Sequence, residues 1–554
     1  MNIISNNKSQ SPKVLTFLAL AILSSKVGNY KTVLLTAIDS LYWGLHWLDD
    51  VEKYNADMGY TEGNWVPVNN QLEQHQIKLN GTLPAEVVGG MFVRMGTNAK
   101  CWPPVSAHHA FNGEAMMHRI LLRDQSTLEY SNSYVEEYQS GLFNNESCTG
   151  ESCLVPSFSF GDINKGGLAL LRLLLIKLRN RITGESMPSQ ERQQPGSTSL
   201  ITHANRTFTA SEVVMPFEVS LARQGVSPIG FTDLDGLLSN QEHGPMEGTM
   251  SAHPKEDPVS GELFFFSTSH GSGSVPFVNY GVLNANGSPQ KYLQIPVPTP
   301  QAAFYHDMFL TENYAIFFHS SLKKDTKRLA KGESFTFFDE KSPLSFGILP
   351  RNATSASEVI WIDAPNPGHI WHTVGAREDG DCLTLYAPKF SNYSDEIRIH
   401  LPSEEPSYLT KFEIDLTKKE CTETIIFDEV VERPSFNPNV LSPTYVYLRS
   451  EGRKSSEMGK TIIKYNLAIE KAEGEVDCGQ DCNFGEALFV PRPGGESEDD
   501  GYLMDIPYYP ETHTSKFLMW NAKSLSSGVV ASADLPQRVP YGAHGKWLDD
   551  TFFH

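Results

Sequence analysis

From about Asn64 to its end, the chain consists largely of short segments with the residue pattern of β-strands. Clusters such as Asn286-Gly287 and Pro493-Gly494-Gly495 separate these segments and predict turns. Strands that recur every ~10–25 residues indicate an all-β fold, with too many strands for one sandwich. No repeat of fixed period is present, and a large propeller with diverged blades is the economical architecture because radial packing closes the sheet edges. The predicted strands include Thr127–Glu136, Arg206–Val214, Glu262–Thr268, Tyr314–Ser321, Glu358–Asp363, Cys382–Lys389, Lys411–Leu416, Glu423–Glu432, Thr444–Arg449, Thr461–Asn466, Glu486–Pro491, Tyr502–Tyr508 and Lys516–Trp520.

One segment breaks this pattern. Gly166 to Arg181, GGLALLRLLLIKLRNR, carries leucine or isoleucine on most sides of a predicted helix. Basic residues near its end suit the negative end of the helix dipole. Such a helix either packs on a sheet or presents an apolar face to lipid, and the residues alone favour packing.

The first 63 residues differ from the rest. Val14–Ser24 is an apolar run with lysines before it, too short for a typical membrane span and similar to the core of a signal or transit segment. Asn29–Tyr54 has helical spacing and predicts an amphipathic helix on the main body or on a membrane surface. We therefore expect residues 1–63 to form a leader or anchor plus this helix, and residues 64–554 to form a single domain. The leader is compatible with entry into the secretory pathway, with import into plastids and with a simple membrane anchor.

Charge and cysteine content restrict the partners. The formal net charge of −21 argues against a nucleic-acid partner, which needs a basic surface, but allows membrane contact through a local apolar patch. The seven cysteines are sparse and odd in number. Cys478 and Cys482, or Cys148 and Cys153, could pair or bind a metal, but neither pair has a second pair at zinc-site spacing. The cysteines do not settle the redox compartment.

Four of the seventeen histidines stand out by their context. His253 opens a polar turn before an apolar strand, and the other three also lie at predicted strand or turn edges, where they could face a common channel: His306, His372 and His544. Four neutral imidazoles leave a divalent metal its full charge and open positions. Such a site suits Fe(II), where O2 and an organic substrate must meet, better than a closed zinc site.

Metal-bound imidazoles need an acceptor for their other N–H, usually a carboxylate. Three glutamates in apolar or proline-flanked settings are candidates for this role: Glu212, Glu432 and Glu486. A charge in such a setting usually has a partner.

These motifs, taken in order, resemble the carotenoid cleavage oxygenase family, which also includes stilbene-cleaving dioxygenases and a retinoid isomerohydrolase. The resemblance runs from about Leu79 to the C-terminus, and eight or more motifs in family order carry it. They include GTLPAEVVGGMFVRMGTN (Gly81–Asn98), HHAFNGEAMMH (His108–His118), ANRTFTASEVVMPFEV (Ala204–Val219), AHPK-x-DP-x-x-GEL (Ala252–Leu263), HD-x-x-x-TENY (His306–Tyr314), ERPSFNP (Glu432–Pro438), GEALFVPR (Gly485–Arg492), EDDGYLM (Glu498–Met504) and GAHG-x-W (Gly542–Trp547).

The resemblance implies a seven-bladed propeller with Fe(II) on its axis, the four histidines above as ligands, the three glutamates as acceptors behind them, and no further catalytic side chain. For the third ligand His369 competes with His372, and the family's alanine and glutamate spacing, met by Ala376 and Glu378, fits only His372. Two departures are Gly375, where the family usually has Asn, and Glu114-Ala115, where it usually has Asp-Gly. We expect them to spare the metal site and to affect strand packing.

The resemblance also implies a function. We expect cleavage of a carbon–carbon double bond of a carotenoid or apocarotenoid with O2, with stilbene cleavage, retinyl-ester isomerohydrolysis and a catalytically silent binding module as alternatives. The apolar helix falls where family members carry a helical cap, an insertion near residues 162–182 that lines a substrate entrance in contact with membrane. This shifts the expectation for that helix from packing to membrane contact.

Overall fold

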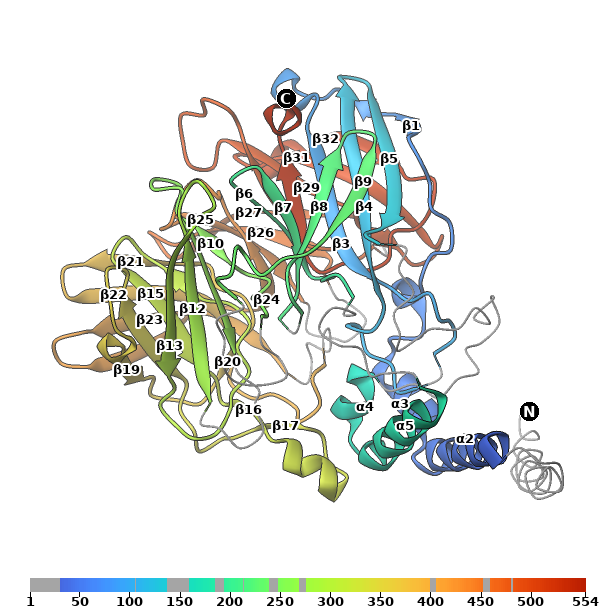
Figure 1. Cartoon of the computed structure of the whole chain (residues 1–554). Coiled ribbons are helices and arrows are strands. Elements are labelled where there is room, and N and C mark those ends of the chain that lie inside the picture. The colour runs from blue at the N-terminus through green and yellow to red at the C-terminus, as the bar shows by residue number, and fades with distance from the viewer. Residues whose placement is uncertain are drawn as a thin grey trace, which may run out of the picture.

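Antiparallel β-sheets are the main elements of the computed structural model (Figure 1), as predicted for an all-β chain. The structure describes residues 30–104, 106–136, 159–184, 194–212, 214–238, 248–268, 276–398, 405–451, 459–479 and 482–554. The predicted leader segment Val14–Ser24 and the cysteines Cys148 and Cys153 lie outside the described residues.

Four of the sheets belong to the N-terminal two thirds of the chain. The first combines β1 (His75–Lys78), β5 (Thr127–Tyr134), β4 (Glu114–Asp124) and β3 (Met91–Asn98) with the last strand, β33 (Gly545–Leu548). The second runs from β6 to β9 (Ser199–His203, Arg206–Ala210, Phe217–Ala222, Gly225–Phe231), and the third from β10 to β13 (Lys255–Glu256, Leu263–Thr268, Phe277–Leu283, Pro289–Pro296). The fourth pairs β14 (Phe309–Leu310), β15 (Tyr314–His319), β18 (Ser345–Pro350) and β19 (Ile360–Asp363), and a small hairpin, β16 (Leu322–Lys324) and β17 (Thr336–Phe338), lies apart from it.

An eight-stranded sheet follows and has two halves that share one long strand, β24 (Glu420–Ser435). The first half contains β20 (His369–Ile370), β21 (Gly375–Asp379), β22 (Cys382–Phe390) and β23 (Ser407–Asp415), and the second contains β25 (Tyr445–Ser450), β26 (Thr461–Asn466) and β27 (Lys471–Asp477). The pairing register of β24 shifts on both sides, and Arg433 within it has a positive φ of 51°, so the strand bends between the halves.

The last sheet joins the two ends of the chain. It contains β28 (Leu488–Pro491), β29 (Gly501–Asp505), β31 (Thr514–Asn521), β32 (Val529–Asp534) and the early strand β2 (Asn80–Gly81), with β30 (Tyr508–Tyr509) paired to β31. Because β3 also pairs with β33, the N-terminal and C-terminal strands hold each other in two neighbouring sheets. Phe92 and Phe517 meet in the apolar layer between these sheets, with ring centroids 6.5 Å apart.

Each predicted strand overlaps an observed one, and the differences lie at the ends. Glu358, for example, was predicted to begin a strand, but it ends a short 3-10 helix (Ala356–Glu358) before β19. There Ser355 and Glu358 form a reciprocal capping box, and such side-chain hydrogen bonds to the backbone compete locally with strand pairing.

The described helices gather at one end of the β-body (Figure 1): α2 (Tyr30–Leu48), α3 (Val51–Met58), α4 (Phe160–Lys165) and α5 (Ala169–Thr183). The apolar segment therefore forms a helix, α5. The continuous helix expected over Asn29–Tyr54 is broken instead, because Asp50 adopts a left-handed conformation and Asp49 turns to pair with Arg172 of α5. Among the described helices, none has the length and apolar character needed to cross a bilayer.

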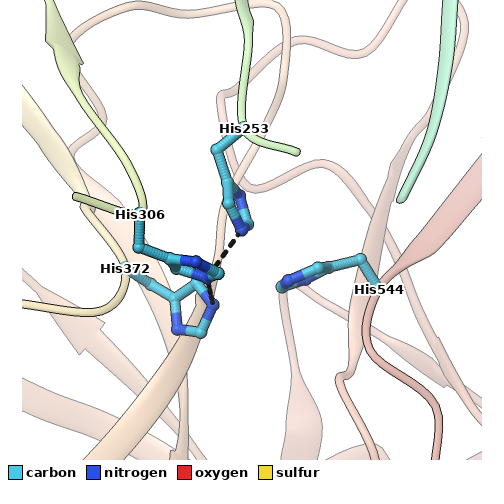
Figure 2. Close-up of side chains that lie close together, drawn as sticks. All are labelled: His253, His306, His372 and His544. Atoms are coloured by element: carbon cyan, nitrogen blue, oxygen red, sulfur yellow. Dashed lines mark hydrogen bonds between the residues drawn. The ribbon is translucent and has the colours of Figure 1, made fainter. Parts of the chain in front are cut away.

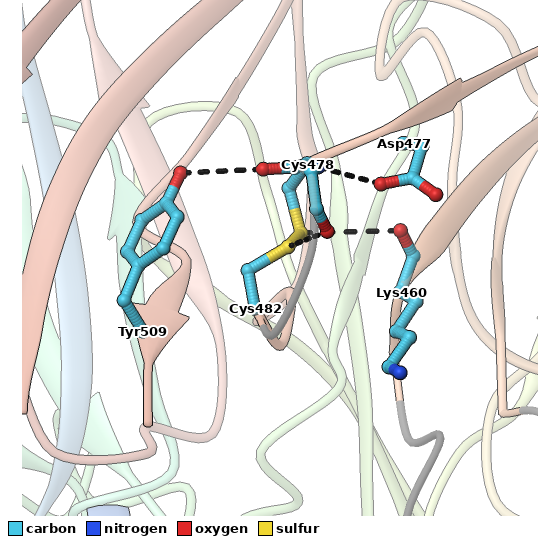
Figure 3. Close-up of a disulfide and its surroundings, with 6 residues drawn as sticks. Lys460, Asp477, Cys478, Cys482 and Tyr509 are labelled. Carbon is cyan, nitrogen blue, oxygen red and sulfur yellow. Dashed lines mark hydrogen bonds between the residues drawn. A yellow bond between two sulfur atoms is a disulfide. The ribbon is translucent and has the colours of Figure 1, made fainter. Parts of the chain in front are cut away.

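A disulfide joins Cys478 and Cys482 just after β27 (Figure 3). Of the two expected roles for these cysteines, pairing and metal binding, the structure therefore shows pairing. The Tyr509 hydroxyl donates a hydrogen bond to the Cys478 carbonyl at 3.5 Å and connects this loop to β30. The disulfide lies in the connection that follows β27, and Cys482 is fully buried.

Candidate metal centre

Each predicted histidine ligand lies beside an edge strand of its sheet. His253 precedes β10, His306 precedes β14 and His544 directly precedes β33, while His372 lies between β20 and β21. The loop at His253 is a local hairpin: the Asp257 N–H donates to the Glu262 carbonyl at 2.9 Å, and Gly261 takes the positive φ of 70° that the turn requires. Four separate sheets thus deliver one imidazole each to a common point.

The four imidazole rings converge in space (Figure 2), although up to 291 residues separate them (His544 minus His253). One ring nitrogen from each histidine lies within 4.8 Å of the others. Nε2 of His253 and His306 are 3.0 Å apart, and Nε2 of His306 and His372 are 3.3 Å apart. Two nitrogens bound at right angles to one ion at about 2.1 Å would lie about 3 Å apart, so this spacing suits a single transition-metal ion.

Carboxylates stand behind three of the four rings. Nδ1 of His306 lies 2.7 Å from Oε1 of Glu212. Nδ1 of His372 is 2.6 Å from Oε2 of Glu432, and Nδ1 of His544 is 2.8 Å from Oε1 of Glu486. In the described part of the chain, no carboxylate is hydrogen-bonded to His253. A carboxylate that accepts the Nδ1–H fixes the tautomer in which Nε2 presents its lone pair to a metal.

Burial favours the neutral form of the His253 and His372 imidazoles, and the neutral imidazole is the form that binds metals. Burial lowers the pKa of His253 and of His372 well below 6.5, and the neighbouring histidines lower both further. Burial alone would raise the pKa of Glu486, but its pairing with His544 and the charge of Arg433 lower it to about 2. Burial raises the pKa of Glu432 to about 7. The donor set, four imidazoles of which three are backed by carboxylates, fits a ferrous ion.

His369, the competitor for the third ligand position, lies outside the cluster. It is fully buried, and its Nδ1 is hydrogen-bonded to the Ser320 hydroxyl at 2.7 Å. The structure also explains the glycine at position 375. A Cβ at this position would lie 2.4 Å from Cδ of Pro443, so there is no room for the asparagine of the family pattern. At the other departure, the Glu114 carboxylate is buried and accepts a hydrogen bond from the Lys100 N–H at 2.8 Å.

Sequence reasoning missed a set of polar residues that connects three of the histidine loops. Nζ of Lys255 lies 2.7 Å from Oδ1 of Asp307, whose Oδ2 accepts hydrogen bonds from the N–H and hydroxyl of Thr373, both at 2.8 Å. These residues flank His253, His306 and His372. Burial alone would raise the pKa of Asp307, but Lys255 lowers it below 3.8. The feature of the sequence that could have indicated these contacts is Asp307, a charged residue directly after the candidate ligand His306 in an otherwise apolar segment.

A cavity with an empty volume of about 710 Å³, including its open mouth, adjoins the centre. Three of the histidines line it, namely His306, His372 and His544. Aromatic side chains form one part of its wall: Phe111, Trp371, Phe390 and Tyr393. A ligand in this cavity would therefore touch both an apolar surface and the face of the histidine cluster.

These features define the class: a β-sheet protein in which loops beside edge strands bring together four histidines that could hold a metal ion, next to a cavity. The comparisons with known proteins name the group more closely. The family model described as RPE65, retinal pigment epithelial membrane protein, matches residues 65–549.

Relatives with similar sequences cover most of the chain. The carotenoid 9,10(9′,10′)-cleavage dioxygenase of Crocus sativus is 29% identical over 89% of this chain and 89% of its own length. The 9-cis-epoxycarotenoid dioxygenase NCED1, chloroplastic, of Oryza sativa subsp. japonica is 30% identical over 88% of this chain and 75% of its own length.

Solved structures show the same fold. The lignostilbene dioxygenase of Pseudomonas brassicacearum superposes with a TM-score of 0.73 at 20% identity, over 88% of this chain and 98% of its own. Cobalt-substituted Synechocystis ACO gives a TM-score of 0.68 at 19% identity, over 88% and 98% of the two chains. The chain belongs to the RPE65 and carotenoid cleavage oxygenase family and is a dioxygenase enzyme.

Proposed function

We propose that this protein is a non-haem Fe(II) dioxygenase that cleaves a carbon–carbon double bond of a carotenoid or apocarotenoid with O2 and releases two carbonyl products. The observation that carries the proposal is the convergence of four imidazoles, three of them backed by carboxylates, beside an aromatic-walled cavity. The sequence relatives that are carotenoid cleavage or epoxycarotenoid dioxygenases support this substrate class.

In this proposal the metal ligands are His253, His306, His372 and His544, and their supporting carboxylates are Glu212, Glu432 and Glu486. Ferrous iron bound there would supply the redox chemistry that allows O2 to react with an alkene. The glutamates hold three ring tautomers, and the Lys255–Asp307–Thr373 contacts keep three ligand loops in register.

The proposed cleavage reaction requires no acid or base catalysis by side chains. One C=C bond and the O–O bond break and two C=O bonds form, so no proton enters or leaves and no acid or base is needed. The task of the chain is to bind, orient and exclude water. Trp371 contributes to all three, because its ring packs 4.9 Å from that of His306 and its N–H is held by the Tyr393 hydroxyl at 3.1 Å.

We propose further that residues 64–554 form one oxygenase domain and that its sheets are the seven blades of a propeller around the histidine axis. Six sheets of four or more strands, the largest with two halves, supply seven such groups. The helices near one end of this body would then act as the cap.

Membrane contact by α2 and α5 is part of the same proposal. These packed helices expose large apolar side chains: Tyr30, Leu34, Leu41, Trp47, Leu48, Leu171, Leu174 and Leu178. An apolar surface of this kind can insert into the interface of a bilayer and receive a substrate that is insoluble in water. Flotation with phosphatidylcholine vesicles tests it: Leu174→Ser with Leu178→Ser should release the protein, and unchanged flotation would contradict the proposal.

For the compartment we propose an organelle reached through the N-terminal segment, with plastids first because three relatives are named chloroplastic. A fluorescent fusion of residues 1–63 should enter plastids. Entry into the secretory pathway would contradict this choice. The oxidising lumen of that pathway would be compatible with the Cys478–Cys482 disulfide.

The decisive experiment compares wild type and His306→Ala after anaerobic loading with Fe(II). Wild type should bind about one iron per chain and convert β-carotene or an apocarotenal to two carbonyl products identified by mass, with both oxygen atoms from O2. His306→Ala should lose the iron and the activity. If the variant keeps both, the four histidines are not the iron ligands. If wild type binds no iron, either as purified or after loading with Fe(II), the four-histidine assignment fails and a binding module becomes the better hypothesis.

Stilbene cleavage is the second candidate, because charged and polar side chains also line the cavity and could hold a phenol: Arg398, Glu405, Ser407, Arg449 and Glu451. Incubation with resveratrol, with product masses as the readout, distinguishes it from carotenoid cleavage. Isomerohydrolysis of a retinyl ester would proceed without consuming O2, so an oxygen electrode separates that chemistry from both.

A further inference from the structure

Two unlike groups of residues, one aromatic and one charged, line the cavity beside the histidine centre. The charged group is called the charged wall below. It consists of six residues: Arg398, Glu405, Glu432, Arg433, Arg449 and Glu451. Glu432 supports His372, but a site built only for a hydrocarbon would gain nothing from the other charged groups, since burying charge is costly unless it is paired or meets a polar ligand.

The charges in this wall balance. It contains three arginines and three glutamates, so its formal charge is zero. A carboxylate or an ammonium group on a ligand would lack a matching excess charge. A neutral group that both donates and accepts hydrogen bonds, such as a hydroxyl, finds partners of both kinds.

Glu451 offers the clearest unused acceptor. It is only 5% exposed, and its Oε1 accepts a hydrogen bond from Nε of Arg449 at 2.7 Å. Its Oε2 is buried and has no hydrogen-bond partner in the described residues. A buried carboxylate oxygen without a donor is costly and uncommon in native proteins, and a hydroxyl on a bound ligand would satisfy it.

Arg449 holds Glu451 in place. Its guanidinium also donates to the carbonyls of Phe484 and Gly485, both at 3.3 Å, and is itself buried. A second buried carboxylate, Glu405, lines the same cavity and accepts the Ser394 N–H at 2.7 Å. Both carboxylates are thus anchored by the protein and are present before any ligand arrives, as a preorganised binding site requires.

We propose that the Arg449–Glu451 side of the cavity is a subsite for a neutral hydroxylated end of the substrate, so that the enzyme selects oxygenated substrates over plain hydrocarbons. This rests on the proposed alkene-cleaving function and specifies its substrate class. The apolar body of the substrate packs against the aromatic residues beside the metal centre, and its terminal hydroxyl donates to Oε2 of Glu451. The hydroxyl belongs to a hydroxylated polyene or to a phenol.

Two matched ligand pairs test the proposal and separate these sources: zeaxanthin against β-carotene, and resveratrol against its trimethyl ether. Each pair keeps the conjugated skeleton: the first pair differs by two hydroxyls, and in the second pair methyl groups replace the hydroxyl protons. Binding is measured on metal-free protein by quenching of tryptophan fluorescence, and kcat and KM are measured on iron-loaded protein. The variants are Glu451→Gln, which keeps an acceptor for Arg449, and Glu475→Gln, a matched control on an exposed position of β27.

In at least one pair, the hydroxylated ligand should bind wild type about tenfold more tightly, because a hydrogen bond to a charged group has that effect. Glu451→Gln should reduce this preference several-fold by raising KM while kcat stays nearly constant, as expected for a contact that holds the substrate and the transition state equally well. Glu475→Gln should leave it unchanged. The pair that shows the preference identifies the source of the hydroxyl.

Equal affinity within both pairs would overturn the proposal, and so would a preference that survives in Glu451→Gln. These results are independent of the proposed function. If iron-loaded protein cleaves no alkene while metal-free protein still prefers the hydroxylated ligands, the cleavage reaction is wrong and the subsite stands. If cleavage occurs without any preference, only the subsite is wrong.

Discussion

Replacement of Glu486 by glutamine tests how the carboxylates behind the histidines support the metal. The change keeps the size of the side chain and removes its charge. Both carboxylate oxygens are in use: Oε1 accepts from Nδ1 of His544 at 2.8 Å, and Oε2 accepts from the Gly545 N–H at 2.7 Å. A glutamine has one accepting oxygen and one donating NH2 group, so in either orientation its NH2 faces another donor.

The magnitude follows from that count. Loss of a hydrogen bond to a charged group costs about 1.5–3 kcal/mol. At about 1.4 kcal/mol per factor of ten, metal affinity should fall by about 10- to 100-fold. Removal of a partner of a metal-bound histidine typically has an effect of this size, about 10- to 100-fold.

Glu432→Gln provides the contrast within the same centre. Oε2 of Glu432 accepts from Nδ1 of His372 at 2.6 Å and also from the Arg433 N–H, whereas Oε1 has no hydrogen-bond partner among the described residues. The glutamine can place its oxygen at the Oε2 position and its NH2 where no donor stands. We expect affinity to fall by less than about fivefold.

The assay loads each variant anaerobically with Fe(II) and measures the iron retained against increasing chelator. Glu475→Gln serves as the control, and thermal unfolding verifies that each variant folds. Equal losses in Glu486→Gln and Glu432→Gln would refute the reasoning from hydrogen-bond counts. Unchanged retention in both would show that these carboxylates do not orient the ligands.

Three further predictions concern stability, each measured by denaturant titration. Gly375→Asn brings a Cβ to 2.4 Å from Cδ of Pro443 and should lower the free energy of unfolding by about 1–3 kcal/mol. Arg172→Met leaves the buried carboxylate of Asp162 without its cation and should cost about 3–5 kcal/mol. For Asp499, burial alone would raise the pKa, but its lysine partner lowers it below 3.8. Its contribution is therefore present above that value and lost below it, so the stability advantage of wild type over Asp499→Asn should shrink from about pH 7 to about pH 3.

Matched controls accompany these variants. At Gly474 an added Cβ would meet nothing within 4 Å, so Gly474→Asn should cost less than Gly375→Asn, and equal costs would rule out the contact with Pro443 as the cause. Arg181 is exposed on the same helix as Arg172, and Arg181→Met should be nearly neutral. A difference between wild type and Asp499→Asn that does not depend on pH would contradict the ion-pair explanation.

Local chemistry determined much of what the sequence predicted. The turn after His253 is an example, since its hydrogen bond joins Asp257 to Glu262 and its positive φ falls on Gly261, all within one short stretch. Strand segments are recognisable for the same reason: alternation, β-branched residues and turn residues act over a few positions. The helical form of α5 was predictable on this basis, whereas the break at Asp50 was not, because the preceding Asp49 turns to a partner over a hundred residues away.

The sequence by itself therefore determined the all-β class, most strand positions and, through motif resemblance, which histidines and glutamates to examine. Only the tertiary structure decided that Glu212 serves His306, that Glu432 serves His372 and that Glu486 serves His544.

The charged wall around Glu451 and the link from Lys255 through Asp307 to Thr373 likewise became visible only in the folded chain. The physical reason is common to all of these. The histidine–glutamate pairs, the charged cavity residues and the lysine–aspartate–threonine link all bring together segments that lie far apart in the chain. The pairing of strands and the packing of sheets against one another place these segments within reach.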